Sequence, residues 1–234
     1  MLTEILLVCL AAAIISIDVR TIGGTMLSRP LILGPLAGFL MGDIGTGFIV
    51  AVFVELLWIG LVPIGAYLPV ESLPITVVTV VLAVHLRNAT GNMPYITLIL
   101  FALMVAVPLG YVGRWLESHI RNMNSYISRK LLEKAGEGEF GMISAAQYLN
   151  IVVTFTKNFL LCFIPVWFGH DIFVTVINSM PAQVKEGVFS AGWLIPALGF
   201  AVVMEIFLVA RHLKIFFLSY ILSIAVFFAV KIIR

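Results

Sequence analysis

The fold of this chain is decided by residues 28–72, which read SRPLILGPLAGFLMGDIGTGFIVAVFVELLWIGLVPIGAYLPVES. The stretch is apolar enough for a membrane, yet helix breakers interrupt it at Pro30, Pro35, Gly42, Gly45, Gly47, Pro63, Gly65 and Pro69. Charges lie within or beside its apolar parts, at Arg29, Asp43, Glu55 and Glu71. Broken helices at membrane depth persist only where protein or a watery cavity surrounds them, and charges inside a bilayer mark functional sites. We therefore expect a solute site built from interrupted helices.

Composition places the whole chain in a membrane. Of its 234 residues, 62% are hydrophobic and 11% are charged, and the mean hydropathy is +1.13. A soluble domain is about half apolar and about a quarter charged, so we predict a polytopic membrane protein. The net charge of +2 gives no reason to expect a nucleic-acid partner.

The N-terminal third contains apolar segments that are too short to cross comfortably. They are 2–17, 31–41, 48–62 and 74–86. A helix needs about 20 apolar residues to span the hydrocarbon core, so we expect segments that enter the membrane and turn back. Residues 1–92 are accordingly predicted to form a broken-helix, solute-binding region.

Residues 93–234 are predicted to form a second region of full spans. The expected spans are 95–112, 147–168, 188–210 and 215–230. Between the first two lies a polar segment, 114–141, which we expect to be a cytoplasmic loop because it is rich in lysine and arginine. The fold class is therefore all-α: re-entrant or broken helices followed by full transmembrane spans.

Glu55 and Trp58 are the strongest candidates for binding a solute. They are three residues apart and would share one face of a helix. A carboxylate accepts hydrogen bonds from sugar hydroxyls, and an indole can cover the apolar face of a pyranose. The alternative is a buried Glu55 paired with Arg29, beside an interfacial Trp58.

Two further turns, at the ends of expected re-entrant segments, are candidates for the same site. Glu71 lies between two expected re-entrant segments, and Gly24 with Thr25 forms another turn. Such tips are well placed to meet a polar solute, although solvated turns would carry the same residues. We include Glu71, Gly24 and Thr25 in the expected substrate-binding set.

Other residues of this stretch are expected to support the site. Asp43 lies in a glycine-rich turn beside Gly45 and can cap a helix that begins near Thr46. Arg29 precedes Pro30, which favours extended backbone at Arg29. Its guanidinium would neutralise Asp43 or Glu55, or anchor the chain at the lipid headgroups.

No enzyme class is expected of this chain by itself. The four histidines are scattered without metal-ligand spacing, and neither an HExxH helix nor a Gly-x-Ser-x-Gly elbow occurs. We therefore predict no metal site and no cofactor. Cys9 and Cys162 lie in apolar runs and are expected to be packing residues.

The motifs of the first third resemble one known family. They are Ser28-Arg-Pro30, Gly34-Pro-Leu-Ala-Gly38, Gly42-Asp43, Gly45-Thr-Gly47, Glu55-Leu-Leu-Trp58 and Pro63-Ile-Gly-Ala66. This pattern is similar to the enzyme IIC membrane component of the mannose/fructose/sorbose family of the sugar phosphotransferase system. A weaker likeness continues into the later spans.

The resemblance implies a sugar permease of the bacterial cytoplasmic (inner) membrane. It implies a second membrane subunit, IID, with IIC–IID pairs assembling into larger hetero-oligomers. It also implies that the sugar is phosphorylated as it reaches the cytoplasm, by a phosphohistidine on a soluble IIB subunit that IIA supplies. Glu55 resembles the family's intramembrane glutamate, while Arg29 and Asp43 resemble structural positions around the site.

The substrate that the resemblance implies is a hexose or an amino sugar of the mannose, sorbose or N-acetylgalactosamine type. The motif around Glu55 is slightly more similar to the amino-sugar branch. At Pro69-Val70-Glu71, however, the chain departs from the Asp or Asn that the family often has, which leaves the sugar open. Two other functions are compatible with the residues: an ion-coupled secondary transporter that uses Glu55 and Asp43 as ion carriers, or a non-transporting membrane sensor or scaffold.

Overall fold

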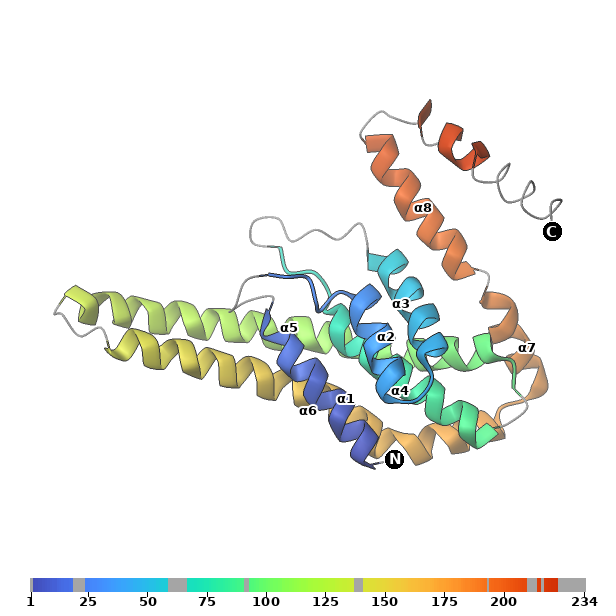
Figure 1. Cartoon of the computed structure of the whole chain (residues 1–234), viewed down its shortest axis with the longest axis horizontal. Coiled ribbons are helices and arrows are strands. Elements are labelled where there is room, and N and C mark those ends of the chain that lie inside the picture. Colours follow the sequence, from blue (N-terminus) through green and yellow to red (C-terminus); the bar gives the residue numbers. More distant parts are fainter. Residues whose placement is uncertain are drawn as a thin grey trace.

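The computed structural model shows a helical molecule in which a long hairpin extends from a bundle of shorter helices (Figure 1). The structure describes residues 2–18, 24–58, 67–90, 93–136, 141–192, 194–209, 214–215 and 217–222. Within these ranges there is no strand. The helices are α1 (Leu2–Ser16), α2 (Pro30–Leu40), α3 (Ile44–Trp58), α4 (Ser72–Thr90), α5 (Tyr95–Gly136), α6 (Gly141–Ser179), α7 (Ala182–Ala191) and α8 (Leu194–Val209).

The long hairpin consists of α5 and α6, which run side by side in opposite directions and project well beyond the other helices (Figure 1). Helices α2, α3 and α4 pack together near the base of the hairpin, and α1 lies along α6. Helix α7 follows the end of α6, and α8 leaves the body of the molecule while contacting α3. The broken helices are therefore held against a frame of long ones.

Helix α4 forms the centre of the core. Residues 73–86 are all buried, because α4 is surrounded by α1, α2, α3, α5 and α6. The sequence-based prediction of a short segment over 74–86 is wrong, since the helix has 19 residues and is long enough to cross a membrane. Pro74 lies in its first turn, where a proline removes no intrahelical hydrogen bond, and the polar residues 87–90 continue the helix.

Helices α1 and α2 are as short as predicted, with 15 and 11 residues. Helix α3 has 15 residues and begins at Ile44, four residues before the predicted segment 48–62, whose last four residues lie outside the described part of the chain. Helix α2 begins with Pro30 directly after Arg29, whose backbone is extended. It ends before Gly42, which adopts a positive φ of 78° and lets the amide of Asp43 donate to the carbonyl of Gly38 at 2.8 Å. The chain thereby reverses directly into α3.

Glycines allow α2 and α3 to pack with their backbones in contact. A Cβ atom at Gly34 would lie 2.7 Å from both Ala51 Cβ and the carbonyl oxygen of Gly47. A Cβ atom at Gly47 would collide with the carbonyl oxygen of Gly34. Small residues at helix contacts are a general means of close packing in membranes. The glycine motifs of the sequence therefore form the contact surface of a helical hairpin.

The polar segment 114–141, predicted to be a loop, is helical up to Gly136 and again from Gly141. Residues 114–135 contain neither proline nor glycine, so nothing in the backbone ends the helix after the apolar part. Residues 169–187, which include several polar side chains, are also helical over most of their length, within α6 and α7. Polarity alone was a wrong guide to loops here.

Among the described residues, four stretches are long and apolar enough to cross a membrane: Ser72–Ala89, Tyr95–Lys134, Gly141–Gly169 and Ala182–Glu205. The last of these corresponds to the span predicted over 188–210, which the structure divides between α7 and α8. Most of the final predicted span, 215–230, lies outside the described residues, as does the 63–66 part of the family motif.

Candidate functional site

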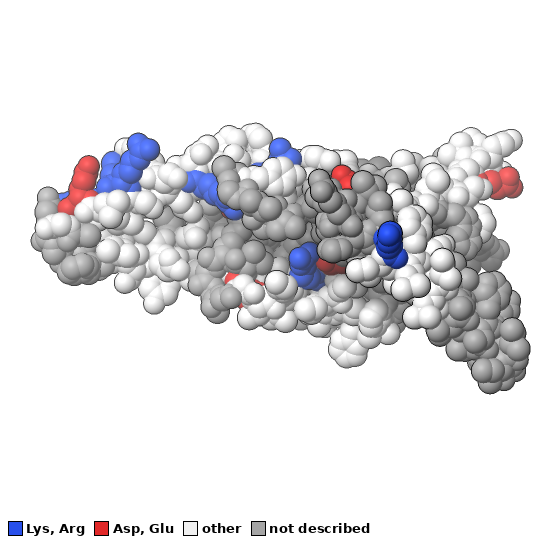
Figure 2. Space-filling view, turned by 90° about the horizontal axis from the view of Figure 1, so that it is seen from above, with Lys and Arg blue, Asp and Glu red and all other residues white. Residues whose placement is uncertain are grey.

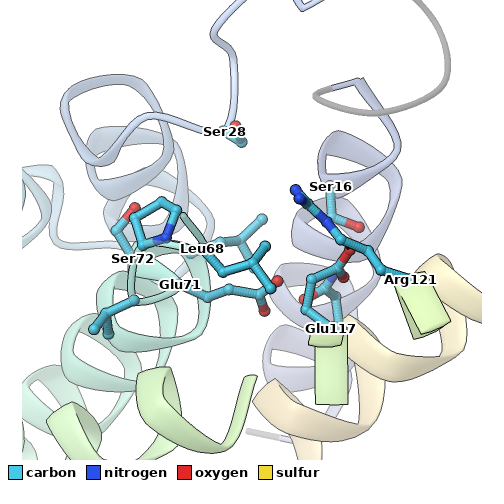
Figure 3. A pocket seen from close by; sticks show the side chains of 11 residues that line it. Ser16, Ser28, Leu68, Glu71, Ser72, Glu117 and Arg121 are labelled. Atoms are coloured by element: carbon cyan, nitrogen blue, oxygen red, sulfur yellow. The ribbon is translucent and has the colours of Figure 1, made fainter. Parts of the chain in front are cut away.

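A polar cavity of about 340 Å³ lies where the broken helices meet the base of the hairpin. It is enclosed by the end of α1, the residues before α4, and the facing sides of α5 and α6 (Figure 3). Its polar lining residues are Ser16, Ser28, Glu71, Ser72, Glu117, Arg121 and Asn158. Of the predicted substrate-binding residues, Glu71 lines this cavity.

Glu71 is held in the cavity by a buried charge network. The ammonium group of Lys157, on α6, lies 2.6 Å from Glu71 Oε1 and 3.0 Å from Glu117 Oε2. Arg121, one turn after Glu117 on α5, places its Nε atom 3.6 Å from Glu117 Oε1. The side chains of Lys157 and Glu117 are each only 4% exposed. The network therefore joins the tip before α4 to both helices of the hairpin.

Two glycines of α5 make room for this tip. The backbone amide of Glu71 donates to the carbonyl oxygen of Gly110 at 3.3 Å. A Cβ atom at Gly113 would lie 2.6 Å from Glu71 Oε2. Figure 3 shows the carboxylate of Glu71 reaching across the cavity toward Glu117 and Arg121. The position of Glu71 is thus set by backbone packing as well as by charge.

Glu55 lies near the end of α3 and is paired with Arg29. The guanidinium Nη1 of Arg29 donates to Glu55 Oε1 at 3.0 Å, so Arg29 neutralises Glu55 rather than Asp43. The Glu55 side chain is 11% exposed, and its Oε2 atom is buried with no hydrogen-bond partner among the described residues. Trp58 is half-buried against the main core. Neither Glu55 nor Trp58 lines the cavity at Glu71.

Gly24 and Thr25 form a turn that is tied to the end of α1. Asp18 accepts hydrogen bonds at its backbone carbonyl from the Gly24 amide and at its side chain from the Thr25 amide, both at 3.1 Å. The Thr25 amide beside the carboxylate holds the pKa of Asp18 below its usual value. Gly24 and Thr25 are both exposed and lie outside the cavity lining. The structure thus separates them from Glu71.

Asp43 caps α3, as predicted. Its carboxylate accepts hydrogen bonds from the Thr46 amide at 3.0 Å and from the Thr46 hydroxyl at 2.5 Å. It also pairs with Arg87, near the end of α4, at 2.6 Å, and the Arg87 guanidinium lies 5.2 Å from the centre of the Tyr95 ring. A Cβ atom at Gly45 would lie 3.4 Å from Asp43 Oδ1. Asp43 therefore fastens the turn between α2 and α3 to α4.

Sequence reasoning missed Glu117, Lys157 and Arg121. The available signal for Lys157 was its position as the one ionised residue of the expected span 147–168, where a charge is costly unless it has a partner. Glu117 and Arg121 are four residues apart, a spacing that forms ion pairs on helices, but they lie in the segment 114–141 that the sequence predicts to be a loop.

Comparisons with known proteins identify the family of this chain and support its fold. The family model of the PTS system sorbose-specific IIC component matches residues 2–234. The chain belongs to this family. The resemblance noted in the sequence is thus confirmed, and this IIC chain is a polytopic membrane protein of the sugar phosphotransferase system.

Relatives with related names are distant in sequence. The N-acetylgalactosamine permease IIC component 1 of Escherichia coli is 22% identical over 191 residues, which cover 80% of this IIC chain and 67% of the relative. The mannose-specific EIIC component of Escherichia coli is 21% identical over 197 residues, covering 82% and 70%.

The fold is also that of a solved transporter. A cryo-EM structure of the mannose transporter ManYZ with a bound microcin superimposes with a TM-score of 0.58, at 21% identity, over 94% of this chain and 84% of that one. Another membrane protein structure superimposes with a TM-score of 0.67, at 20% identity, over 99% and 92%. The predicted all-α membrane fold is confirmed.

Proposed function

We propose that this IIC chain binds a neutral hexose or amino sugar in the cavity at Glu71 and carries it across the membrane. The observation that carries the proposal is a largely buried carboxylate, fixed by the buried Lys157, in an open cavity of about 340 Å³. Small-molecule pockets have volumes of about 300–1,000 Å³, so the cavity falls at the lower end of that range, as a single sugar ring requires.

The chemistry of the lining suits a sugar. Carboxylate oxygens accept hydrogen bonds from hydroxyl groups, while serine hydroxyls and the Asn158 amide both donate and accept them. The charges of Glu71, Glu117, Lys157 and Arg121 cancel, with two negative and two positive groups. A neutral solute therefore adds no uncompensated charge to a site that is already balanced.

Glu55 and Trp58 are proposed as a second contact for the sugar along its path. The Oε2 atom of Glu55 is buried without a hydrogen-bond partner among the described residues, so it is an available acceptor. Arg29 is proposed as the residue that positions Glu55, because its guanidinium donates to the other carboxylate oxygen, Oε1, at 3.0 Å. Gly24 and Thr25 remain proposed contacts at a neighbouring turn.

We further propose that transport is coupled to phosphorylation of the sugar. In this proposal a soluble IIB subunit, supplied by IIA, gives the phosphoryl group, and this chain contributes binding and passage but no phosphorylated residue. It works with a IID subunit in IIC–IID pairs in the bacterial inner membrane. The end of the hairpin, with the basic residues of α5, faces the cytoplasm.

The test is phosphoenolpyruvate-dependent phosphorylation of a sugar panel by membranes that carry this chain with its IID partner, IIB and the general components. One sugar is expected to be phosphorylated, and Glu71→Gln is expected to raise its KM at least about tenfold, the effect of one lost hydrogen bond to a charged group. Glu55→Gln tests the second contact in the same assay. Glu186→Gln, an exposed glutamate on α7, is the matched control.

Three outcomes would each refute part of the proposal. If the assembled complex phosphorylates no sugar, a sensor or scaffold role is favoured instead. If uptake of a sugar is abolished by a protonophore and does not need phosphoenolpyruvate, the chain is an ion-coupled carrier. If Glu71→Gln leaves the KM unchanged, the cavity is not the sugar site.

A further inference from the structure

The charge network at the cavity ends in one cation that is only loosely engaged. Arg121 pairs with Glu117 through its Nε atom at 3.6 Å, and its side chain is 50% exposed. Glu117, by contrast, is held by Lys157 at 3.0 Å. Among the described residues, no other side-chain hydrogen bond or ion pair of Arg121 occurs. The two terminal nitrogens of its guanidinium are therefore open to a ligand.

We propose that Arg121 binds the phosphoryl group while it is transferred to the sugar, a role that rests on the proposed function of the cavity. Arg121 lines the cavity together with Glu71, and Figure 3 shows its guanidinium extending from α5 toward Ser16, beside Glu117. The planar guanidinium presents paired N–H donors that match two phosphate oxygens. Arginine is thus the side chain best suited to this contact.

The other charges of the cavity direct a phosphoryl group to Arg121. Glu71 and Glu117 repel an anion from the interior, and Lys157 is already engaged by both carboxylates at 2.6 and 3.0 Å. Arg121 is the exposed member of the network, so it offers positive charge where the cavity opens. A sugar whose ring lies near Glu71 can then present one hydroxyl toward Arg121.

The location of Arg121 suits access by a phosphoryl donor. It lies in the polar half of α5, where further cations follow at Arg129, Lys130 and Lys134. Figure 2 shows lysine and arginine side chains along the hairpin part of the visible face. Basic segments beside membrane spans face the cytoplasm, which is the side from which a soluble phosphoprotein would approach.

The transfer step balances without a further reagent. The bond between phosphorus and the histidine nitrogen of the donor breaks, and its electron pair returns to that nitrogen. A bond forms between phosphorus and the sugar hydroxyl oxygen, and the hydroxyl proton ends on the released histidine. Arg121 compensates the negative charge on the oxygens of the transferred group, as arginine does in other phosphoryl transfers.

The test separates sugar binding from phosphorylation in the assembled IIC–IID complex. Arg121→Gln is expected to bind the unphosphorylated sugar within twofold of wild type, because the ring contacts lie at Glu71. Its rate of phosphorylation by IIB is expected to fall about 10²-fold, as for loss of one preorganised donor to a developing charge. Arg121→Lys should recover part of the rate, and Arg114→Gln, at an exposed arginine of α5 outside the cavity lining, should change neither quantity.

The results distinguish this role from the function on which it rests. If Arg121→Gln phosphorylates the sugar at the wild-type rate, Arg121 does not bind the phosphoryl group, although the cavity still does its proposed work. If both Arg121→Gln and Arg121→Lys lose sugar binding and phosphorylation together, Arg121 only maintains the cavity. If the wild-type complex binds no sugar, the proposed function itself is refuted.

Discussion

Replacement of Lys157 by methionine should destabilise this chain strongly. Methionine has a similar volume but no charge, so the substitution leaves the carboxylates of Glu71 and Glu117 without their shared ammonium group. Those side chains are 13% and 4% exposed, and water cannot replace the lost partner fully. Removing one partner of a buried ion pair costs about 3–5 kcal/mol.

This free energy translates into a large thermal shift. For a chain of about this length, each kcal/mol lowers the unfolding midpoint by about 2–4 °C. Lys157→Met is therefore expected to lower the midpoint by about 6–20 °C. The measurement is thermal unfolding of the purified IIC–IID complex in detergent, followed by size-exclusion chromatography after heating. Lys185→Met, on α7, is the control, because no ion pair of Lys185 occurs among the described residues.

A second variant shows whether the unpaired charge is the cause. Lys157→Met combined with Glu117→Gln removes one of the two carboxylates that Lys157 holds. Replacing buried charges by neutral groups is often tolerated, so the double variant should regain at least half of the lost stability. The reasoning is refuted if Lys157→Met unfolds within 2 °C of wild type, or if the double variant is no more stable than the single one.

Three further predictions concern the packing of the broken helices. Gly47→Leu should prevent accumulation of folded protein, because a side chain there collides with the backbone of Gly34, whereas a normal yield in detergent would contradict the packing. Asp43→Ala should cost about 1–2 kcal/mol through loss of the α3 cap, measured as a lowered unfolding midpoint; an unchanged midpoint would argue against the cap. Cys9 and Cys162, both fully buried and free, should react with a membrane-permeant maleimide only after unfolding, and labelling of the native complex would show that they are accessible.

The sequence was sufficient for the features that depend on local backbone chemistry. Asp43 caps α3 and Arg29 has extended backbone before Pro30, because each of these features needs only neighbouring residues. The burial of Cys9 and Cys162 was also predicted correctly, since they lie in continuous apolar runs. Composition alone identified a membrane protein.

Helix boundaries in polar segments could not be obtained in this way. The continuation of α5 to Gly136 and the start of α6 at Gly141 bring polar residues into long helices that pack on each other. Hydropathy reports where a chain can enter a membrane and gives no information on whether the helix continues outside it. The length of α4 was underestimated for the same reason.

Arg29 illustrates an ambiguity that only tertiary structure resolved. Its sequence environment allowed a pair with Asp43 or with Glu55. In the fold, Arg87 from α4 forms an ion pair with Asp43, and Arg29 forms one with Glu55. Which carboxylate an arginine neutralises depends on how helices from distant parts of the chain pack. The separation of two residues in the sequence does not reveal their distance in the fold.

The sequence by itself determined the membrane environment, the broken helices and the family to which the chain belongs, because these follow from composition and short motifs. Only the tertiary structure decided that Glu71 lies in a cavity with Glu117 and Arg121 and that it pairs with Lys157, which is 86 residues away in the chain. The reason is physical. Each of these charges is unfavourable in an apolar environment alone, and only the packing of α4 between α5 and α6 brings compensating charges within 2.6–3.6 Å.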